Sequence, residues 1–159
     1  MATSTLLVLL VRHADIQVPR TLDDPPISPE GSLRAAELSR IVAVFTSCGL
    51  PLRALYASEA TRTQETLEPV SRATGVAISV IDAADTNALK REIISHPDGI
   101  VVVAGHSNTI PLAIEVLGGP AGVMIRESDF DRLFTLAPVQ TSLVNFAMLR
   151  YGTVKTAVS

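Results

Sequence analysis

Short runs of hydrophobic residues alternate along the chain with segments in which hydrophobic residues recur at every third or fourth position. Four of these runs, at residues 6–10, 54–57, 76–81 and 100–103, predict β-strands. The run at 100–103 is continuously apolar, which is typical of a strand in the middle of a sheet covered on both faces. Strands that alternate with helical segments predict an α/β fold.

Residues that favour helix starts and stops mark the first two helical segments. Ser28-Pro29-Glu30 combines an N-cap residue, a proline at the first helical position and an acid in the first turn, and Gly49 is expected to end this helix. Ser58 is expected to cap the second helix, which Pro69 should kink or shorten. The two helices are thus expected to connect successive strands of the sheet.

Two further helices are predicted in the second half of the chain. Asp85 or Thr86 is expected to cap the third helix. The turn Gly105–Thr109 follows the most apolar strand and leads into the fourth helix.

The last part of the chain predicts a different kind of strand pairing. Residues 133–136 form a further short apolar run, and the alternating run 143–149 is expected to form an antiparallel edge hairpin with residues 154–158. The whole pattern predicts a three-layer α/β/α sandwich with a mostly parallel central sheet and an antiparallel C-terminal edge. We expect residues 1–159 to form one domain.

Composition and charge narrow the classes of function. The 159 residues are 47% hydrophobic and 18% charged, which is typical of a globular protein. The formal net charge is −3, so no excess of basic residues favours nucleic acid or an anionic membrane as a partner. An anion-binding site must therefore come from a local concentration of arginines.

The cysteine content and the N-terminal segment bear on localisation. Cys48 is the single cysteine, so no internal disulfide forms, and a reducing compartment, the cytoplasm, is expected. Residues 1–5 hold no Lys or Arg, so the apolar run that follows is interpreted as a strand and not as a secretion signal. A chain trimmed of its signal would look the same. Cys48 is interpreted as a small core residue and not as a nucleophile.

Three polar clusters follow predicted strands and are candidates for chemistry. They are Arg12-His13, Ser58–Arg62 and Gly105–Asn108. Sites in such sheets lie beyond the carboxyl ends of the strands, so these clusters should converge on one pocket suited to a phosphate group. Each has an ordinary explanation when taken singly: Arg62 as a solvated helix residue, His106 as a loop histidine and Ser58 as a cap.

Four pieces of sequence together resemble the histidine phosphatase superfamily, the phosphoglycerate-mutase-like fold, in its short form. They are Leu10–Ala14, Ile27–Gly31, Tyr56–Thr66 and Val103–Thr109. The resemblance covers nearly the whole chain. It implies that His13 is the nucleophile that becomes phosphorylated and that the transferring phosphoryl group is bound by Arg12, Arg62 and His106. We expect main-chain N–H groups around Ser107 and Asn108 to hold a further oxygen.

The chain departs from the family pattern at two places. Ala14 stands where glycine is commoner, which is a mild change. Many members also carry a Glu or Asp after the third strand that acts as the proton donor. Here Asp85 is the candidate and Asp82 the reserve, although either residue is also explained as a helix cap.

These features predict a metal-independent phosphatase that acts through a phosphohistidine intermediate on phosphomonoesters or protein phosphohistidine. Its partner would be a phosphorylated small molecule or a phosphorylated protein. No metal or other cofactor is expected, because Asp and Glu do not cluster at ligand spacing. The alternatives are a phosphoglycerate-mutase-type phosphotransferase, which is disfavoured because no long insertion forms a lid, and a non-catalytic phosphate-binding protein.

Overall fold

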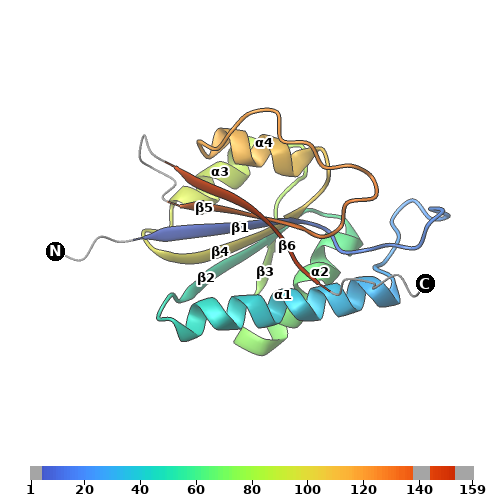
Figure 1. Cartoon of the computed structure of the whole chain (residues 1–159), viewed down its shortest axis with the longest axis horizontal. Coiled ribbons are helices and arrows are strands. Elements are labelled where there is room, and N and C mark those ends of the chain that lie inside the picture. The colour runs from blue at the N-terminus through green and yellow to red at the C-terminus, as the bar shows by residue number, and fades with distance from the viewer. Residues whose placement is uncertain (1–4, 138–143, 153–159) are drawn as a thin grey trace, which may run out of the picture.

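The computed structural model describes residues 5–137 and 144–152, in which a mixed sheet lies between two pairs of helices (Figure 1). The strands are β1 (Leu6–Arg12), β2 (Leu52–Ala57), β3 (Ile78–Val80), β4 (Gly99–Gly105), β5 (Arg132–Ala137) and β6 (Asn145–Arg150). The helices are α1 (Pro29–Ser47), α2 (Thr61–Thr74), α3 (Thr86–Ile94) and α4 (Thr109–Val116).

The sheet has the strand order β3-β2-β4-β1-β5-β6. Its first four strands in that order run parallel, whereas β5 pairs antiparallel with β1 and β6 pairs antiparallel with β5. This confirms the predicted α/β sandwich with a mostly parallel sheet and an antiparallel C-terminal edge. The parallel strands end at one common edge, from which the loop between β1 and α1 projects on the right of Figure 1.

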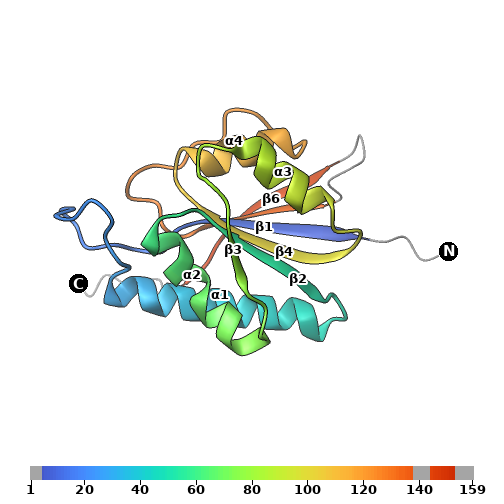
Figure 2. The ribbon, with the colours of Figure 1, turned by 180° about the vertical axis from the view of Figure 1, so that it is seen from behind.

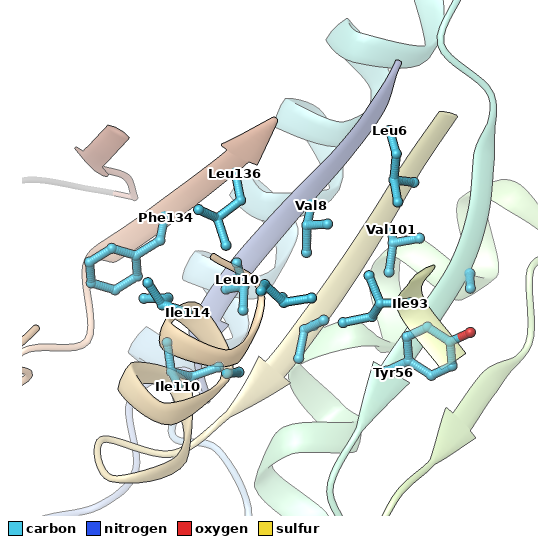
Figure 3. Close-up of a cluster of buried hydrophobic side chains, with 14 residues drawn as sticks. Leu6, Val8, Leu10, Tyr56, Ile93, Val101, Ile110, Ile114, Phe134 and Leu136 are labelled. Atoms are coloured by element: carbon cyan, nitrogen blue, oxygen red, sulfur yellow. The ribbon is translucent and has the colours of Figure 1, made fainter. Parts of the chain in front are cut away.

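Alternation along β1 explains why the sheet needs helices on both faces. Val8 and Leu10 pack with Ile114 on the side of α3 and α4 (Figure 3). Leu9 packs with Leu38 on the opposite side, which α1 and α2 cover (Figure 2). All five side chains have no exposed surface, and each such burial stabilises the fold by roughly 1.5–3 kcal/mol.

The helix starts agree with the sequence at two places and disagree at a third. The side chain of Ser28 caps α1, as predicted, and that of Asp85, one of the two predicted candidates, caps α3. The prediction for Ser58 is wrong, because α2 begins after Ala60, which makes no capping hydrogen bond through its side chain. The Ser58 hydroxyl is instead engaged with a distant residue, described below.

Two expectations about positions within helices are also wrong. Pro69 does not shorten α2, which continues to Thr74, because Leu67 and Val70 on either side of it are fully buried in the core. Cys48 is exposed and is not a core residue. It is the C-cap of α1, beyond the last buried residue of that helix, so the sheet does not cover it.

The edge strands differ from expectation in extent. The strand predicted at 76–81 is limited to the three residues of β3. Within the described residues, β6 pairs with β5. Leu143 and the expected hairpin partner at 154–158 lie outside the described residues.

Candidate active site

The end of β1, the starts of α2 and α4, and the four loops that follow β1, β3, β4 and α4 line a cleft of about 650 Å³. The cleft is the place where the three polar clusters of the sequence meet. The residues that line it are Arg12, His13, Ile16, Val18, Arg20, Arg62, Ala83, His106, Ser107, Asn108, Thr109, Glu127 and Phe130.

His13 lies directly after β1 and is only 3% exposed. Its main-chain N–H donates to the carbonyl of Gly105 at 2.8 Å, which continues the pairing of β1 with β4. Its Nδ1 lies 2.9 Å from the carbonyl oxygen of Ala14. A carbonyl only accepts, so Nδ1 carries the proton and the Nε2 lone pair is left unprotonated. Burial lowers the pKa of His13 to about 3, so the ring is neutral near pH 7.

The main chain that follows His13 is fixed by two contacts. The N–H of Ala14 donates to the hydroxyl of Thr66 on α2 at 2.8 Å. Gly31 in the first turn of α1 lies against Asp15, and a Cβ at this glycine would stand 2.3 Å from the Asp15 carbonyl oxygen. Only glycine permits this close approach, so both helices of one layer hold the histidine segment in place.

Arg12 is buried beside His13 and is held by a turn on the other side of the cleft. Its Nη1 donates to the carbonyls of Arg126, Glu127 and Asp129 at 3.1, 2.8 and 3.2 Å. Its guanidinium carbon lies 4.2 Å from the centre of the Phe130 ring, which adds a cation–π contact. Burial lowers the pKa of Arg12, yet a guanidinium stays charged. The side chain is thus a fixed positive charge at the floor of the cleft.

A hydrogen-bond chain orients His106. Its Nε2 lies 2.8 Å from the Ser58 hydroxyl, which lies 2.9 Å from the hydroxyl of Thr63. The Thr63 hydroxyl donates to the carbonyl of Ala60 at 2.8 Å, so it accepts from Ser58, and Ser58 in turn accepts from His106 Nε2–H. The chain therefore leaves Nδ1 of His106 facing Arg62, whose Nη2 is 3.3 Å away. Burial and the Arg62 charge lower the pKa of His106.

Arg62 is tied to the loop that forms the mouth of the cleft. Its Nη1 lies 3.6 Å from the carboxylate of Asp24, which also accepts from the N–H and the hydroxyl of Thr61 at 3.0 and 2.6 Å. Arg20 of the same loop lines the cleft and contributes to the lowered pKa of Arg62, after burial, by placing a second positive charge nearby. Three arginines thus share the cleft with two histidines.

Ser107 and Asn108 line the same cleft at the start of α4. The turn is fixed by the N–H of His106, which donates to the hydroxyl of Thr109 at 2.9 Å. The N-terminal end of a helix favours anions because its first N–H groups point outward. Both residues therefore lie in the same cleft as His13 and Arg62.

Neither Asp82 nor Asp85 lines the cleft. Both are exposed, and their carboxylates accept main-chain N–H groups of Ala84 and Ala88 at 2.8 and 2.9 Å. Ala83, which lies between them in the sequence, is the residue of this segment that reaches the cleft. The structure thus brings together Arg12, His13, Arg62, His106, Ser107 and Asn108, but not the two candidate acids.

Two further observations concern metal sites and membrane-spanning helices among the described residues. No three His, Cys, Asp or Glu side chains in residues 5–137 and 144–152 lie close enough to hold a metal ion together. Within the same ranges, no helix is long and apolar enough to cross a membrane.

Comparison with known proteins agrees with this geometry. The family model of the histidine phosphatase superfamily (branch 1) matches residues 8–85, which include Arg12, His13 and Arg62. Residues 8–85 thus carry the sequence pattern of the histidine phosphatase superfamily. No curated protein sequence matches the chain.

Solved structures of histidine phosphatases and other hydrolases share the fold at low sequence identity. The protein histidine phosphatase SixA in complex with tungstate has a TM-score of 0.66 at 16% identity, with 91% of this chain and 96% of SixA covered. The mycobacterial glucosyl-3-phosphoglycerate phosphatase has a TM-score of 0.67 at 12% identity, with 92% and 98% covered. A protein described as mycobacterial hydrolase 2 has a TM-score of 0.70 at 12% identity, with 96% and 94% covered.

The structure gives four further residues a place in the site. Arg20, Glu127 and Phe130 lie outside the three predicted clusters, and Ser58 lies in one of them but makes a contact with His106 that the sequence did not predict. Ser58 was hidden by its position, because a serine shortly before a helix is most simply explained as a cap. The other three lie in loops without hydrophobic periodicity, so no sequence signal connects them with His13.

Proposed function

We propose that this protein is a metal-independent phosphatase in which His13 accepts the phosphoryl group. The observation that carries the proposal is the unprotonated Nε2 of His13 in a cleft that also holds Arg12, Arg62 and His106. A neutral imidazole is a nucleophile, and two fixed guanidinium groups neutralise the charge of the phosphoryl oxygens.

Substrate binding uses charges that are already in place. Arg12 is held by three carbonyls and Arg62 by Asp24, so neither side chain has to be ordered when the phosphate arrives. A bound phosphate anion offsets the Arg62 charge that lowers the pKa of His106, so Nδ1 of His106 can carry a proton and donate it in a hydrogen bond to a phosphate oxygen.

The transfer then takes two steps at phosphorus. Nε2 of His13 attacks, the bond from phosphorus to the leaving oxygen breaks, and the electron pair stays on that oxygen, which takes up a proton. Water then attacks the phosphohistidine, the P–N bond breaks, the electron pair returns to Nε2 and inorganic phosphate leaves. The hydrogen bond from Nδ1 to Ala14 stabilises the positive ring of the phosphohistidine in between.

The substrate is either a phosphomonoester or a phosphohistidine on a protein. Val18, which lines the cleft, is 74% exposed, and this access from solvent favours entry of a protruding phosphorylated side chain. Two proteins with this fold support the two alternatives by name, one as a protein histidine phosphatase and the other as a glucosyl-3-phosphoglycerate phosphatase.

A panel of phosphorylated metabolites and phosphohistidine proteins, assayed with the purified protein and with His13→Ala as the blank, tests the proposal. We expect release of phosphate by the wild type, none above background by the variant, and full activity in excess chelator. Activity retained by His13→Ala would show that His13 is not the nucleophile. Activity that is lost in chelator and returns only with an added metal would contradict the metal-independent mechanism. Transfer to a second acceptor instead of water would identify a mutase, and phosphate binding without turnover a binding protein.

A further inference from the structure

Glu127 places a carboxylate in the cleft at a position that no sequence pattern predicts. Among the described residues that line the cleft, it is the only one with a carboxyl group. Its Oε2 lies 3.6 Å from Nη2 of Arg12, and its side chain is 92% exposed. Arg12 is among the phosphate-binding residues of the proposed function, so this carboxylate stands next to the position of the phosphate.

The position of Glu127 is set by its main chain. The carbonyl of Glu127 itself accepts from Arg12 Nη1 at 2.8 Å, and the carbonyls of Arg126 and Asp129 accept from the same nitrogen. The carboxylate of Asp129 closes the turn by accepting from the N–H of Arg126 at 3.1 Å, and Arg132 lies 3.5 Å from it. The turn is therefore a built support that carries the Glu127 side chain at the mouth of the cleft.

An ordinary explanation of this carboxylate is charge balance for Arg12. Burial lowers the pKa of Arg12 and the Glu127 carboxylate acts to raise it, but the Glu127 side chain is 92% exposed, so this pairing does not enclose the carboxylate. Arg12 is also held in place without the carboxylate, through three carbonyls and the ring of Phe130. The carboxylate is thus dispensable for positioning Arg12 and is free to turn toward a bound substrate.

We propose that Glu127 is the proton donor and acceptor of the reaction, a role that rests on the proposed function of His13. As the P–O bond breaks, the leaving oxygen keeps the electron pair and takes the proton of the Glu127 carboxylic acid. In the second step the Glu127 carboxylate takes a proton from water as the water oxygen bonds to phosphorus and the electron pair of the P–N bond returns to His13. Glu127 is then protonated again, and the cycle is balanced.

The charges around Glu127 suit both halves of this cycle. A phosphate dianion that binds Arg12 competes with the Glu127 carboxylate for this arginine, so the carboxyl group can leave the ion pair and turn toward the leaving oxygen. The exposed rotamer allows the carboxyl group to reach a leaving oxygen at the mouth of the cleft, on the solvent side of the buried His13.

The test compares two probes that differ in their need for an acid. p-Nitrophenyl phosphate has a leaving group that departs without a proton, whereas glycerol 2-phosphate leaves as an alkoxide unless it is protonated. For Glu127→Gln we expect kcat/KM to fall by about 10²-fold or more with glycerol 2-phosphate and by less than about threefold with p-nitrophenyl phosphate. Glu127→Asp should recover part of the lost activity. Glu115→Gln, at an exposed position of α4, is the control and should leave both reactions unchanged.

Three outcomes would overturn the proposal. Equal loss with both probes, or no loss with either, would show that Glu127 does not protonate the leaving group. A lower KM and a lower inhibition constant for inorganic phosphate, with kcat unchanged, would show that Glu127 only competes with phosphate for Arg12. A wild type without activity that depends on His13 on either probe would instead overturn the proposed function itself.

Discussion

Two segments at the carboxyl edge of the sheet carry ionisable side chains and place them differently. Arg12 and His13 follow the inner strand β1 and are 4% and 3% exposed. Asp82 and Asp85 follow β3, the three-residue edge strand, and remain exposed with their carboxylates bound to main-chain amides. An inner strand ends inside the molecule and delivers the next side chains to a cleft, whereas a short edge strand ends at the surface. Sequence spacing from a strand therefore does not suffice to place a catalytic group.

The first test of this comparison measures how the free energy of unfolding depends on pH in the acid range, where we expect the largest effect. The unfolded chain protonates His13 below about pH 6.5, whereas the folded chain keeps it neutral down to about pH 3. The unfolded state therefore binds the extra proton in this window, and the free energy of unfolding falls as the pH falls, by up to about 1.4 kcal/mol per pH unit from this group.

Urea unfolding at a series of pH values measures this slope. His13→Ala should flatten it between about pH 6 and pH 4, because the substituted side chain takes up no proton. Identical slopes for the two proteins would mean that the His13 ring is not held neutral by burial.

Removal of a cleft charge should give the largest effect on turnover after loss of the nucleophile. Arg62→Ala should lower kcat/KM by about 10²–10³-fold, because a donor that stabilises transition-state charge is lost. Arg62→Lys should recover only part of the activity, since an ammonium lacks the planar fork. Arg53→Ala, which removes an exposed arginine paired with Asp98, is the matched control. Full activity of Arg62→Lys would show that only a general positive charge is needed.

Loss of the hydroxyl that orients His106 should have a smaller effect. Ser58→Ala should lower kcat/KM about tenfold, equivalent to one hydrogen bond of about 1.4 kcal/mol. A positioning role also predicts a shift in the pH profile of kcat, because the Nε2–H of His106 loses its acceptor, and recovery in Ser58→Thr. An unchanged pH profile in Ser58→Ala would contradict this role.

The smallest effect on activity is expected at the exposed segment after β3 that carries Asp82 and Asp85. Asp85→Ala should destabilise the protein by about 1 kcal/mol through loss of the α3 cap, with kcat/KM for glycerol 2-phosphate unchanged. Thermal unfolding and the same phosphatase assay measure the two quantities. A loss of activity without loss of stability would place the acid at Asp85, as the sequence predicted, and would remove the contrast between the two segments.

The fold was largely predictable because its signals are local. Apolar runs separated by helical spacing predicted the inner strands, and neighbouring residues identified Ser28 as a cap and Asp85 as one of two candidates for another. The expectations that failed depended on tertiary packing. Pro69 lies within α2 because buried neighbours hold the helix, and Cys48 is exposed because α1 extends past the core.

The residues of the site likewise divide into those that local signals predicted and those that depend on long-range contacts. Arg12, His13, Arg62 and His106 could be proposed because they follow strands whose ends meet at one edge. Long-range contacts could not be predicted, since the bond from Ser58 to His106 spans 48 positions and that from Arg12 to the carbonyl of Glu127 spans 115. No periodic or composition signal encodes such contacts.

The most direct test of the central claim is to trap the phosphorylated protein during turnover. The wild type is mixed with excess p-nitrophenyl phosphate, quenched rapidly without acid and digested, and the peptides are searched by mass spectrometry for acid-labile phosphate. The account predicts phosphate on His13, at Nε2, because Nδ1 is occupied by the Ala14 carbonyl. The label should be absent from His13→Ala and should accumulate in Glu127→Gln, in which water attack is slowed. Turnover without a phosphorylated protein, or phosphate found on His106 instead of His13, would contradict the account.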